Sequence, residues 1–327
     1  MNKAIPRSFS AFRLVLPSAF SNGSNAMQVF GNKCVRNEFL SSATRIITAS
    51  AFAVAVSSAL GFSMAANAAT LEEIKAKGVI SVATEDNYYP FEFIKDGAPE
   101  GFHKDVIAEL QGYAPFKVKQ DIMPWTGLLA GITSGKYDAA ITGAGVTEER
   151  LGAFDFVSPI APEISYYIRR VNDDRIKSLK DLSGLTVGVQ AGGAQLARLT
   201  QLDEKLKSMG GSLGKVVEYQ SYPEAYADLA NGRLDYVVNS IVPANMLVKE
   251  RPKIFAIGEP TSSMGYIAWP VAKGNQELLD YLSGFVAHLR ETGKLAKLQK
   301  KWLGQSFDNL PHQSITSVEQ FKKLSAE

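Results

Sequence analysis

The sequence predicts an α/β protein with two similar lobes, and three observations support this fold class. Strand-like and helix-like patterns alternate along the chain after residue 70, which is typical of parallel βαβ units. One segment recurs: SGKYDAAIT at 134–142 is matched by NGRLDYVVN at 231–239. A length of 327 residues favours two domains.

The hydrophobic pattern of the first unit predicts a strand, a helix, a strand, a helix and a strand, in that order. They fall at 79–83, around 106–110, at 116–118, 125–132 and 137–141. The second unit repeats this order at 185–189, 195–207, 216–219, 225–230 and 234–238. Gly135 and Gly232 each suit the left-handed end of a helix. A cleft between two such lobes, at the carboxyl ends of the strands, is the predicted binding site.

The chain after residue 260 follows another pattern. A strand at 265–269, an amphipathic helix at 277–290 and an apolar stripe at 295–303 are expected to pack back on one lobe, which is then discontinuous. Residues 305–327 form a polar tail with one short amphipathic stretch around Val318, Phe321 and Leu324.

Residues 1–68 are typical of a secretory signal peptide. They carry six basic residues and one acid, then an apolar run from Ile46 to Leu60, and end in Ala66-Asn67-Ala68. A retained membrane anchor is the alternative, but the run is shorter than the roughly 20 residues that a spanning helix needs. Met27 is a second candidate start. Cleavage would remove Cys34 and change the net charge from +2 to −3, with 29 bases and 32 acids remaining.

The composition argues against several classes of function. One cysteine and three scattered histidines, His103, His288 and His312, give no basis for a metal site. A nearly balanced charge argues against a nucleic-acid partner. The mature chain contains neither a nucleophile elbow nor a phosphate-binding Gly-rich loop. The sequence therefore predicts a binding protein without a cofactor, rather than an enzyme.

Some residue positions suggest a binding site. Arg150 follows the strand at 137–142, where a guanidinium can bind a carboxylate through two hydrogen bonds; a surface salt bridge with Asp155 is the alternative. Gly192-Gly193 suits either an anion site or a plain turn. Three aromatic residues near strand ends belong either to the ligand site or to the core. They are Tyr88, Tyr89 and Trp125.

Four segments, 71–93, 101–110, 134–159 and 180–194, resemble the family 3 periplasmic solute-binding proteins, the polar amino-acid receptors of ABC importers. The resemblance implies two doubly wound α/β lobes joined by a two-segment hinge, a type II-like binding-protein fold. Lobe 1 would comprise 70–160 plus 263–327, and lobe 2 would comprise 164–259. Hinge closure would trap an amino acid or a derivative. A monomeric periplasmic protein would then deliver this ligand to a membrane permease.

The resemblance also implies the roles of single residues. Arg150 would bind the α-carboxylate, helped by backbone N–H groups near Gly145 and Ala194. Tyr88 and Trp125 would flank the ligand side chain. Glu85 would contact the polar end of the ligand, and Gln190 would contact the ligand side chain. The Gly143 carbonyl would accept from the ligand ammonium, and Ser240 occupies the position where the family usually has an acid.

Three departures from the family pattern affect the ligand and fold expectations. His103 replaces an acid on a face expected to be exposed, Gly145 replaces Ser or Thr, and Ser240 replaces the Asp that holds the ammonium. Gly145 and Ser240 together resemble opine-type receptors, whose ligands carry a substituted amine and a second carboxylate.

Two other readings of the family remain open. The first is a cyclohexadienyl dehydratase-like enzyme, for which Ala194-Gln195-Leu196 offers no acid where one would be expected. The second is a sensor domain that docks on a membrane signalling partner.

Overall fold

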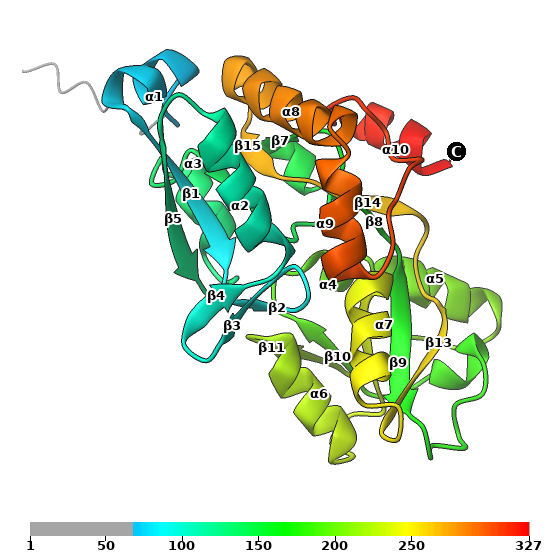
Figure 1. Cartoon of the computed structure of the whole chain (residues 1–327). Helices are drawn as coiled ribbons and strands as arrows, with labels where there is room; N and C mark the ends of the chain where they lie inside the picture. Colours follow the sequence, from blue (N-terminus) through cyan, green and yellow to red (C-terminus); the bar gives the residue numbers. More distant parts are fainter. Residues whose placement is uncertain (1–67, 327) are drawn as a thin grey trace, which may run out of the picture. The chain divides into compact units, whose positions relative to one another are not determined.

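The computed structural model describes residues 68–326, which belong to one compact unit containing two five-stranded sheets (Figure 1). The predicted signal peptide, apart from Ala68, lies outside the described residues. Within the described part, no helix is both long and apolar enough to span a membrane.

The first sheet has the strand order β5-β1-β6-β15-β7. Its strands are β5 (Lys117–Met123), β1 (Val79–Glu85), β6 (Ala139–Ala140), β15 (Pro270–Ala272) and β7 (Phe154–Phe156). β1 runs parallel to β5 and β6, whereas β15 pairs antiparallel with β6 and β7. β15 follows residue 260, so the late part of the chain adds a strand to the first sheet. The strand expected at 265–269 is instead β14 (Gly265–Ile267), which pairs with β8 (Ala161–Glu163) outside this sheet.

The helices that belong to this part of the chain begin with α1 (Leu71–Lys77), whose N-cap is Thr70. The others are α2 (Phe102–Tyr113), α3 (Leu128–Thr133), α8 (Gln276–Glu291) and α9 (Lys294–Leu303). The apolar stripe of α8 is fully buried, and α9 packs against both α2 and α8. The amphipathic pattern thus predicted α8 and α9 nearly to their ends.

The second sheet has the order β11-β10-β12-β9-β13. Its strands are β11 (Val216–Tyr219), β10 (Val187–Gln190), β12 (Tyr236–Ser240), β9 (Ser165–Arg170) and β13 (Phe255–Pro260). β10 runs parallel to β11 and β12, and β9 pairs antiparallel with β12 and β13. Its helices are α4 (Ala194–Ala197), α5 (Leu199–Ser208), α6 (Tyr222–Ala230) and α7 (Ile241–Glu250). The single helix expected at 195–207 is therefore two helices that meet at Arg198.

The sequence repeat is matched by a repeated set of hydrogen bonds. Asp138 accepts from the backbone N–H of Ser81 at 2.7 Å, and Asp235 accepts from that of Thr186 at 2.8 Å. The glycines that precede them, Gly135 and Gly232, have φ values of 71° and 77°. Each aspartate thus ties the end of one helix-to-strand turn to the neighbouring strand.

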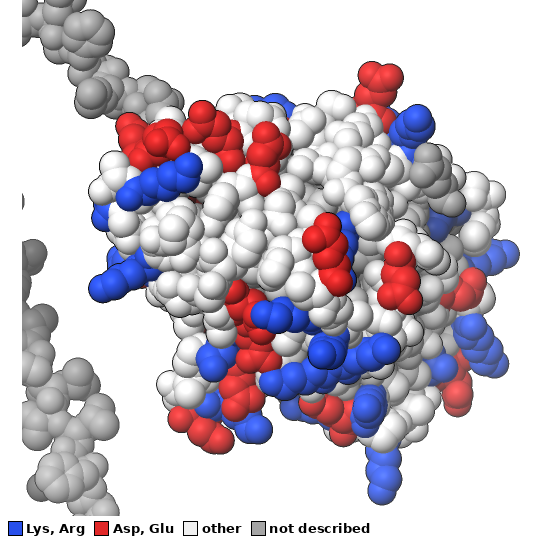
Figure 2. Space-filling model, turned by 45° about the horizontal axis from the view of Figure 1, so that its top comes forward, with Lys and Arg blue, Asp and Glu red and all other residues white. Residues whose placement is uncertain are grey.

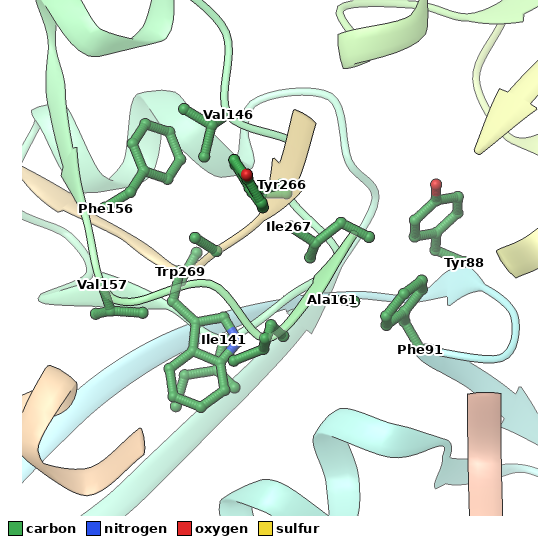
Figure 3. Packing of buried hydrophobic residues seen from close by; sticks show 14 of the residues in the cluster. Tyr88, Phe91, Ile141, Val146, Phe156, Val157, Ala161, Tyr266, Ile267 and Trp269 are labelled. Atoms are coloured by element: carbon green, nitrogen blue, oxygen red, sulfur yellow. The ribbon is translucent and has the colours of Figure 1, made fainter. Parts of the chain in front are cut away.

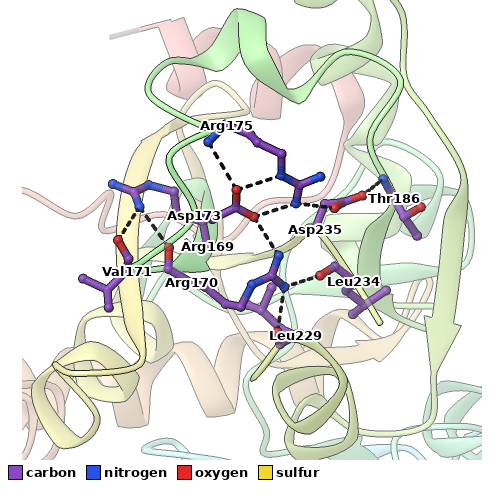
Figure 4. Close-up of polar contacts among 9 residues, drawn as sticks. All are labelled: Arg169, Arg170, Val171, Asp173, Arg175, Thr186, Leu229, Leu234 and Asp235. Atoms are coloured by element: carbon purple, nitrogen blue, oxygen red, sulfur yellow. Dashed lines mark hydrogen bonds and ion pairs between the residues drawn. The ribbon is translucent and has the colours of Figure 1, made fainter. Parts of the chain in front are cut away.

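A charged network centred on Asp173 includes Asp235 at one end of the second sheet (Figure 4). Asp173 pairs with Arg170 and Arg175, each at 2.6 Å, and Arg175 also reaches Asp235 at 2.7 Å. The Arg175 hydrogen bonds lower the pKa of Asp173 to about 2. Arg170 donates in addition to the carbonyl groups of Leu229 and Leu234. The network therefore fixes the loop after β9 to the start of β12.

Smaller sheets lie between and beside the two large ones. β8 (Ala161–Glu163) pairs antiparallel with β14 (Gly265–Ile267), at or near the two hinge segments that the family resemblance implies around 160–164 and 259–263. β2 (Asn87–Tyr88), β3 (Glu92–Lys95) and β4 (Ala98–Glu100) form a three-stranded sheet. The lobe boundaries themselves remain a prediction.

Apolar packing is continuous from one sheet to the other. One buried cluster includes Phe156 from the first sheet, Trp269 just before β15, Ile267 from β14 and Val237 from the second sheet. Figure 3 shows Trp269, Ile141 and Val157 close together, with Tyr266 and Ile267 beside them. A second cluster covers the other face of the second sheet, with Tyr167 and Tyr236 among its members.

The C-terminal tail is part of the fold. α10 (Val318–Ala326) buries Phe321 and Leu324, the apolar residues that the sequence placed on its face. Upstream of it, Ile315 and Phe156 exchange backbone hydrogen bonds at 2.9 and 3.0 Å. The tail therefore extends the edge of the first sheet beyond β7.

The surface carries charges of both signs. On the face shown in Figure 2, basic and acidic side chains lie beside one another in mixed groups. Broad uncharged areas separate these groups. The absence of a nucleic-acid partner stays a prediction.

Candidate functional site

Most of the predicted binding residues line one small cavity between the two sheets, with a volume of about 10 Å³. β1 and β10 end at this cavity, so the carboxyl ends of strands from both sheets meet there. The lining residues are Glu85, Tyr88, Trp125, Gly143, Gly145, Arg150, Gln190, Gly193, Ala194 and Gln195.

Arg150 is buried at the start of the short 3-10 helix η1 (Arg150–Gly152), with an exposed fraction of 8%. Its guanidinium donates to the carbonyl groups of Gly145 at 2.6 Å and Gly192 at 2.9 Å. It also lies 4.9 Å from the ring centre of Trp125, within cation–π range. The arginine thus joins the turn after β6 to the turn after β10.

No carboxylate within residues 68–326 forms an ion pair with Arg150. The alternative salt bridge with Asp155 is wrong, because Asp155 pairs with Lys273 at 2.7 Å. Burial lowers the pKa of Arg150 to about 10, and the negative charge of Glu163 opposes this shift. A buried guanidinium without a paired anion is costly, so the site favours an anionic ligand group.

Glu85 and Gln190 connect the ends of β1 and β10. Gln190 Nε2 donates to Glu85 Oε1 at 2.6 Å, and both side chains are buried. Burial, and next the charge of Glu92, raise the pKa of Glu85 well above its ordinary value, whereas the bond from Gln190 lowers it. Glu85 is therefore a buried acid positioned for a polar or cationic ligand group.

Tyr88 forms one wall of the cavity. Its ring stacks on Phe91 and Tyr222, with centroids 5.6 and 5.7 Å away, and its hydroxyl donates to Asn239 Oδ1 at 3.1 Å. Gly143 lies against the same ring, where any Cβ would overlap the Tyr88 ring atoms. Asn239 and Tyr222 were not predicted from the sequence. Their positions depend on how the second sheet meets β2.

Gly145 and Ala194 lie in close contact across the cavity. A Cβ on Gly145 would lie 2.7 Å from the Ala194 Cβ, so glycine allows this approach. Ser240 does not line the cavity: it is fully buried, and its Oγ has no hydrogen-bond partner within the described residues. Nothing in the structure assigns Ser240 a ligand contact.

Glu163 in β8 is a buried acid that was not predicted from the sequence. It forms an ion pair with Arg198 and accepts from Gln195 Nε2 at 2.8 Å. Burial raises the pKa of Glu163, and the charge of Arg198 opposes the shift. Arg198 also donates to the Val146 carbonyl at 3.1 Å. No local pattern indicated this pair, because its members lie 35 residues apart and meet only in the folded chain.

The expectation that His103 lies on an exposed face is wrong. The side chain is completely buried and lies 2.5 Å from Glu92 Oε2 through its Nδ1. Its Nε2 accepts from the indole N–H of Trp269 at 3.1 Å. Because an indole N–H can only donate, Nδ1 carries the hydrogen and donates to Glu92.

Glu92 connects this histidine to the cavity. Its other oxygen, Oε1, accepts from the Thr142 hydroxyl and from the backbone N–H of Gly143 at 2.9 Å. His103 therefore helps to hold the turn that lines the site.

No cluster of three or more potential metal ligands occurs in the described part of the chain. The acids of the site are held instead by amide and guanidinium groups.

Comparisons with known proteins agree with this arrangement. The family model of bacterial extracellular solute-binding proteins, family 3, matches residues 80–305. The chain is 28% identical over 254 residues to the L-cystine-binding protein TcyJ of Escherichia coli (strain K12). This alignment covers 77% of this chain and 92% of that protein.

Two solved structures are also similar. An ancestral arginine-binding protein bound to arginine has a TM-score of 0.62 and 30% identity, covering 69% of this chain and 98% of that one. The ancestral amino acid-binding protein AncCDT-1, a precursor of cyclohexadienyl dehydratase, has a TM-score of 0.64 and 26% identity, covering 72% of this chain and 100% of that one. The predicted two-lobe α/β fold class and the family resemblance are confirmed.

Proposed function

Because the chain belongs to the bacterial extracellular solute-binding proteins, family 3, we propose that it captures an amino acid or amino-acid derivative between its lobes and delivers it to an ABC transporter permease. Similar proteins are named for binding cystine and arginine. An extracellular family and the leader pattern of residues 1–68 support export to the periplasm through a cleavable signal peptide.

The unpaired charge of Arg150 is the observation that carries this proposal. Within residues 68–326, its buried guanidinium donates hydrogen bonds to two carbonyl groups, at 2.6 and 2.9 Å, and forms no ion pair with an acid. A ligand α-carboxylate would supply the missing negative charge through two parallel hydrogen bonds. Gly145 and Ala194 line the same cavity, and backbone N–H groups near them would assist it.

The other cavity residues would contact the rest of the ligand. Tyr88 and Trp125 flank the cavity, Glu85 would take a polar or cationic end, and Gln190 would bind beside it. The Gly143 carbonyl would accept from the ligand amine. Ser240 stands where the family usually has an Asp that binds the ligand ammonium, so this chain supplies no carboxylate there. The ligand would therefore carry a substituted amine, as opines do, rather than a free ammonium.

A binding role, rather than catalysis, agrees with how the acids of the cavity are engaged. Glu85 accepts from Gln190, and Glu163 is paired with Arg198. AncCDT-1 is itself named an amino acid-binding protein, although it is the precursor of an enzyme. Measurable prephenate turnover by the purified protein would contradict this part of the proposal.

The test is ligand binding by the purified mature chain. Thermal-shift screening of the common amino acids, cystine and opines should give at least one ligand, whose affinity calorimetry then measures. Arg150→Ala should reduce that affinity at least about a hundredfold, because a charge-assisted bidentate contact is lost.

Arg233→Ala is the matched control for this variant. Arg233 is also an arginine, but it is exposed and pairs with Asp228 away from the cavity. The control should bind as the wild type does. Equal affinities for wild type and Arg150→Ala would remove Arg150 from the site, and no binding of any amino acid or derivative would overturn the function.

A further inference from the structure

Glu163 is a buried acid directly behind the wall of the candidate ligand site. It is 1% exposed and belongs to β8, which pairs with β14. A Cβ added to Gly145 would lie 3.3 Å from Glu163 Oε2 and 2.7 Å from the Ala194 Cβ. Gly145 and Ala194 both line the site. The Glu163 carboxylate therefore lies next to the part of the wall where Gly145 provides no side chain.

The two oxygens of this carboxylate have unequal partners. Oε1 accepts from Gln195 Nε2 at 2.8 Å. Oε2 belongs to the ion pair with Arg198, but no donor within residues 68–326 forms a hydrogen bond with it. Buried carboxylate oxygens normally accept hydrogen bonds, because burial without one is costly. Oε2 can therefore accept a hydrogen bond from a ligand.

The charge of Glu163 acts on residues that line the site. Burial lowers the pKa of Arg150 to about 10, and Glu163 is the acid that opposes this shift most strongly. Burial also raises the pKa of Tyr88, and the charge of Glu163 adds to that shift. Because electrostatic effects weaken with distance, Glu163 lies close to both side chains. A ligand whose α-carboxylate is bound by Arg150 would have its amine in the same small cavity.

The position of Glu163 gives two departures from the family pattern a common explanation. Ser240 stands where the resemblance implies an Asp for the ligand ammonium, and Gly145 stands where it implies Ser or Thr. Ser240 is fully buried and does not line the cavity, so it supplies no acceptor there. Gly145, in contrast, leaves Glu163 Oε2 without a side chain in front of it. An acid is thus available from β8 instead of β12.

We propose that Glu163 is the acid that binds the ligand amine, with Oε2 accepting an N–H past Gly145 while Arg150 binds the α-carboxylate. This inference rests on the proposed function and specifies a residue and a chemical requirement of the same site, a protonated amine. A substituted amine keeps its positive charge and two N–H donors, which Glu163 and the Gly143 carbonyl would accept. Arg198 and Gln195 are positioning residues that hold the carboxylate in place.

Octopine and its ether analogue test this requirement, because the analogue differs only in having an oxygen in place of the amine nitrogen. Octopine carries a protonated substituted amine between two carboxylates, whereas the ether has neither the positive charge nor the N–H donors. Calorimetry should show that the wild-type protein binds octopine at least about a hundredfold more tightly than the ether. The ratio of these two affinities is the octopine preference.

Glu163→Gln should reduce the octopine preference about tenfold, whereas a purely structural role would weaken both probes alike. Arg198→Gln should keep the preference, because the charge of Glu163 remains. The double variant leaves no buried charge unpaired and should lose the preference as well, so it serves if the single Glu163→Gln variant does not fold.

Asp155→Asn is the matched control for these variants. Asp155 is also a buried, ion-paired acid, but its partner is Lys273 and it does not line the cavity. The control should leave the octopine preference unchanged.

The outcomes distinguish the inference from the function on which it rests. Equal wild-type affinities for the two probes, or an unchanged preference in Glu163→Gln or the double variant, would overturn the role of Glu163. Loss of the preference in Arg198→Gln would also overturn it, by assigning the effect to the ion pair. If octopine did not bind the wild-type protein, the inference would fail, but binding of another amino acid or derivative would leave the proposed function standing. Failure of every amino acid and derivative to bind would refute both.

Discussion

Two buried arginines in this molecule have different environments. Arg198 is paired with Glu163, so its charge is balanced within the chain. Within residues 68–326, Arg150 donates to carbonyl groups and lies over the Trp125 ring, and it forms no ion pair. At the scale of the residue, the presence or absence of an ion-paired acid distinguishes a structural arginine, Arg198, from a candidate binding arginine, Arg150. The sequence alone does not reveal this distinction, because the acid that pairs with Arg198 is distant in the chain.

Glu85 allows a prediction about pH. Burial raises its pKa in the folded protein, so folding favours the protonated form. Stability from this group is present below the unfolded pKa near 4.5 and is lost as pH rises toward the raised folded value. Glu85→Gln should therefore become increasingly stable relative to wild type as pH rises, because the amide stays uncharged where the buried carboxyl group has to ionise.

Urea unfolding of ligand-free wild type and Glu85→Gln between pH 4 and 8 measures this effect. The two curves should converge at the acid end and diverge as pH rises. Glu218→Gln, at an exposed position in β11 with no ion pair among residues 68–326, is the control and should differ from wild type by the same amount at every pH. If Glu85→Gln lost stability relative to wild type as pH rose, the predicted direction of the stability change would be wrong.

Residues that follow strands could be predicted, whereas residues that depend on tertiary pairing could not. Arg150 was predicted from its place after a strand, because parallel strands bring their carboxyl ends to one edge. Glu85 and Gln190 were implied by the family resemblance. His103 was misjudged, because its burial follows from Trp269, which lies 166 residues away. Asn239 was missed because its contact with Tyr88 joins the two halves of the molecule.

At the scale of the element, the parallel βαβ units were predictable, whereas the antiparallel strands β9 and β13 were not. β9 lies between β12 and β13 in the second sheet and β13 forms its edge, and neither belongs to a repeat. β13 also contains an irregularity between Ile257 and Pro260. The helix expected at 195–207 breaks at Arg198, whose side chain turns toward Glu163 and Val146. Long-range pairing therefore overrode the local helical pattern there.

The helix ends offer a clean test of backbone geometry. Gly232 has a φ of 77°, and a Cβ there would meet no atom within 4 Å. Gly232→Ala should therefore lower the free energy of unfolding by about 1–2 kcal/mol through the left-handed backbone alone.

Chemical denaturation measures this loss, and α2 provides the control. Gly112 is a helical glycine with a similarly open Cβ position but no positive φ. Gly112→Ala should stabilise the protein by about 0.5–1 kcal/mol. If both substitutions had the same sign, the left-handed geometry at Gly232 would not explain the result.

At the scale of the whole molecule, polar contacts close the cleft from both sides. Glu85 meets Gln190, Tyr88 meets Asn239, and Thr126 donates to Gln220 at 2.6 Å. The cavity of about 10 Å³ around Arg150 is far smaller than an amino acid needs. Binding therefore requires the two sheets to move apart and close again.

Solution scattering tests this motion. Without ligand, opening hydrates Arg150 and Glu85, so the radius of gyration should be larger than with saturating ligand. Ligand at a hundred times its Kd should also stabilise the fold by about 2.7 kcal/mol. The radius of gyration of Arg150→Ala should not change when ligand is added. If the radius of the wild-type protein were also the same with and without ligand, hinge closure would be contradicted.

The late position of β15 and the tail has a consequence for the order in which the chain can fold. All strands of the second sheet come from Ser165–Pro260, so that sheet can form as soon as this continuous stretch is available. The first sheet needs β15 at Pro270–Ala272, and Phe156 gains its partner Ile315 later still. Since chains are synthesised from the N-terminus, the half of the molecule whose sequence begins first is the half that is completed last.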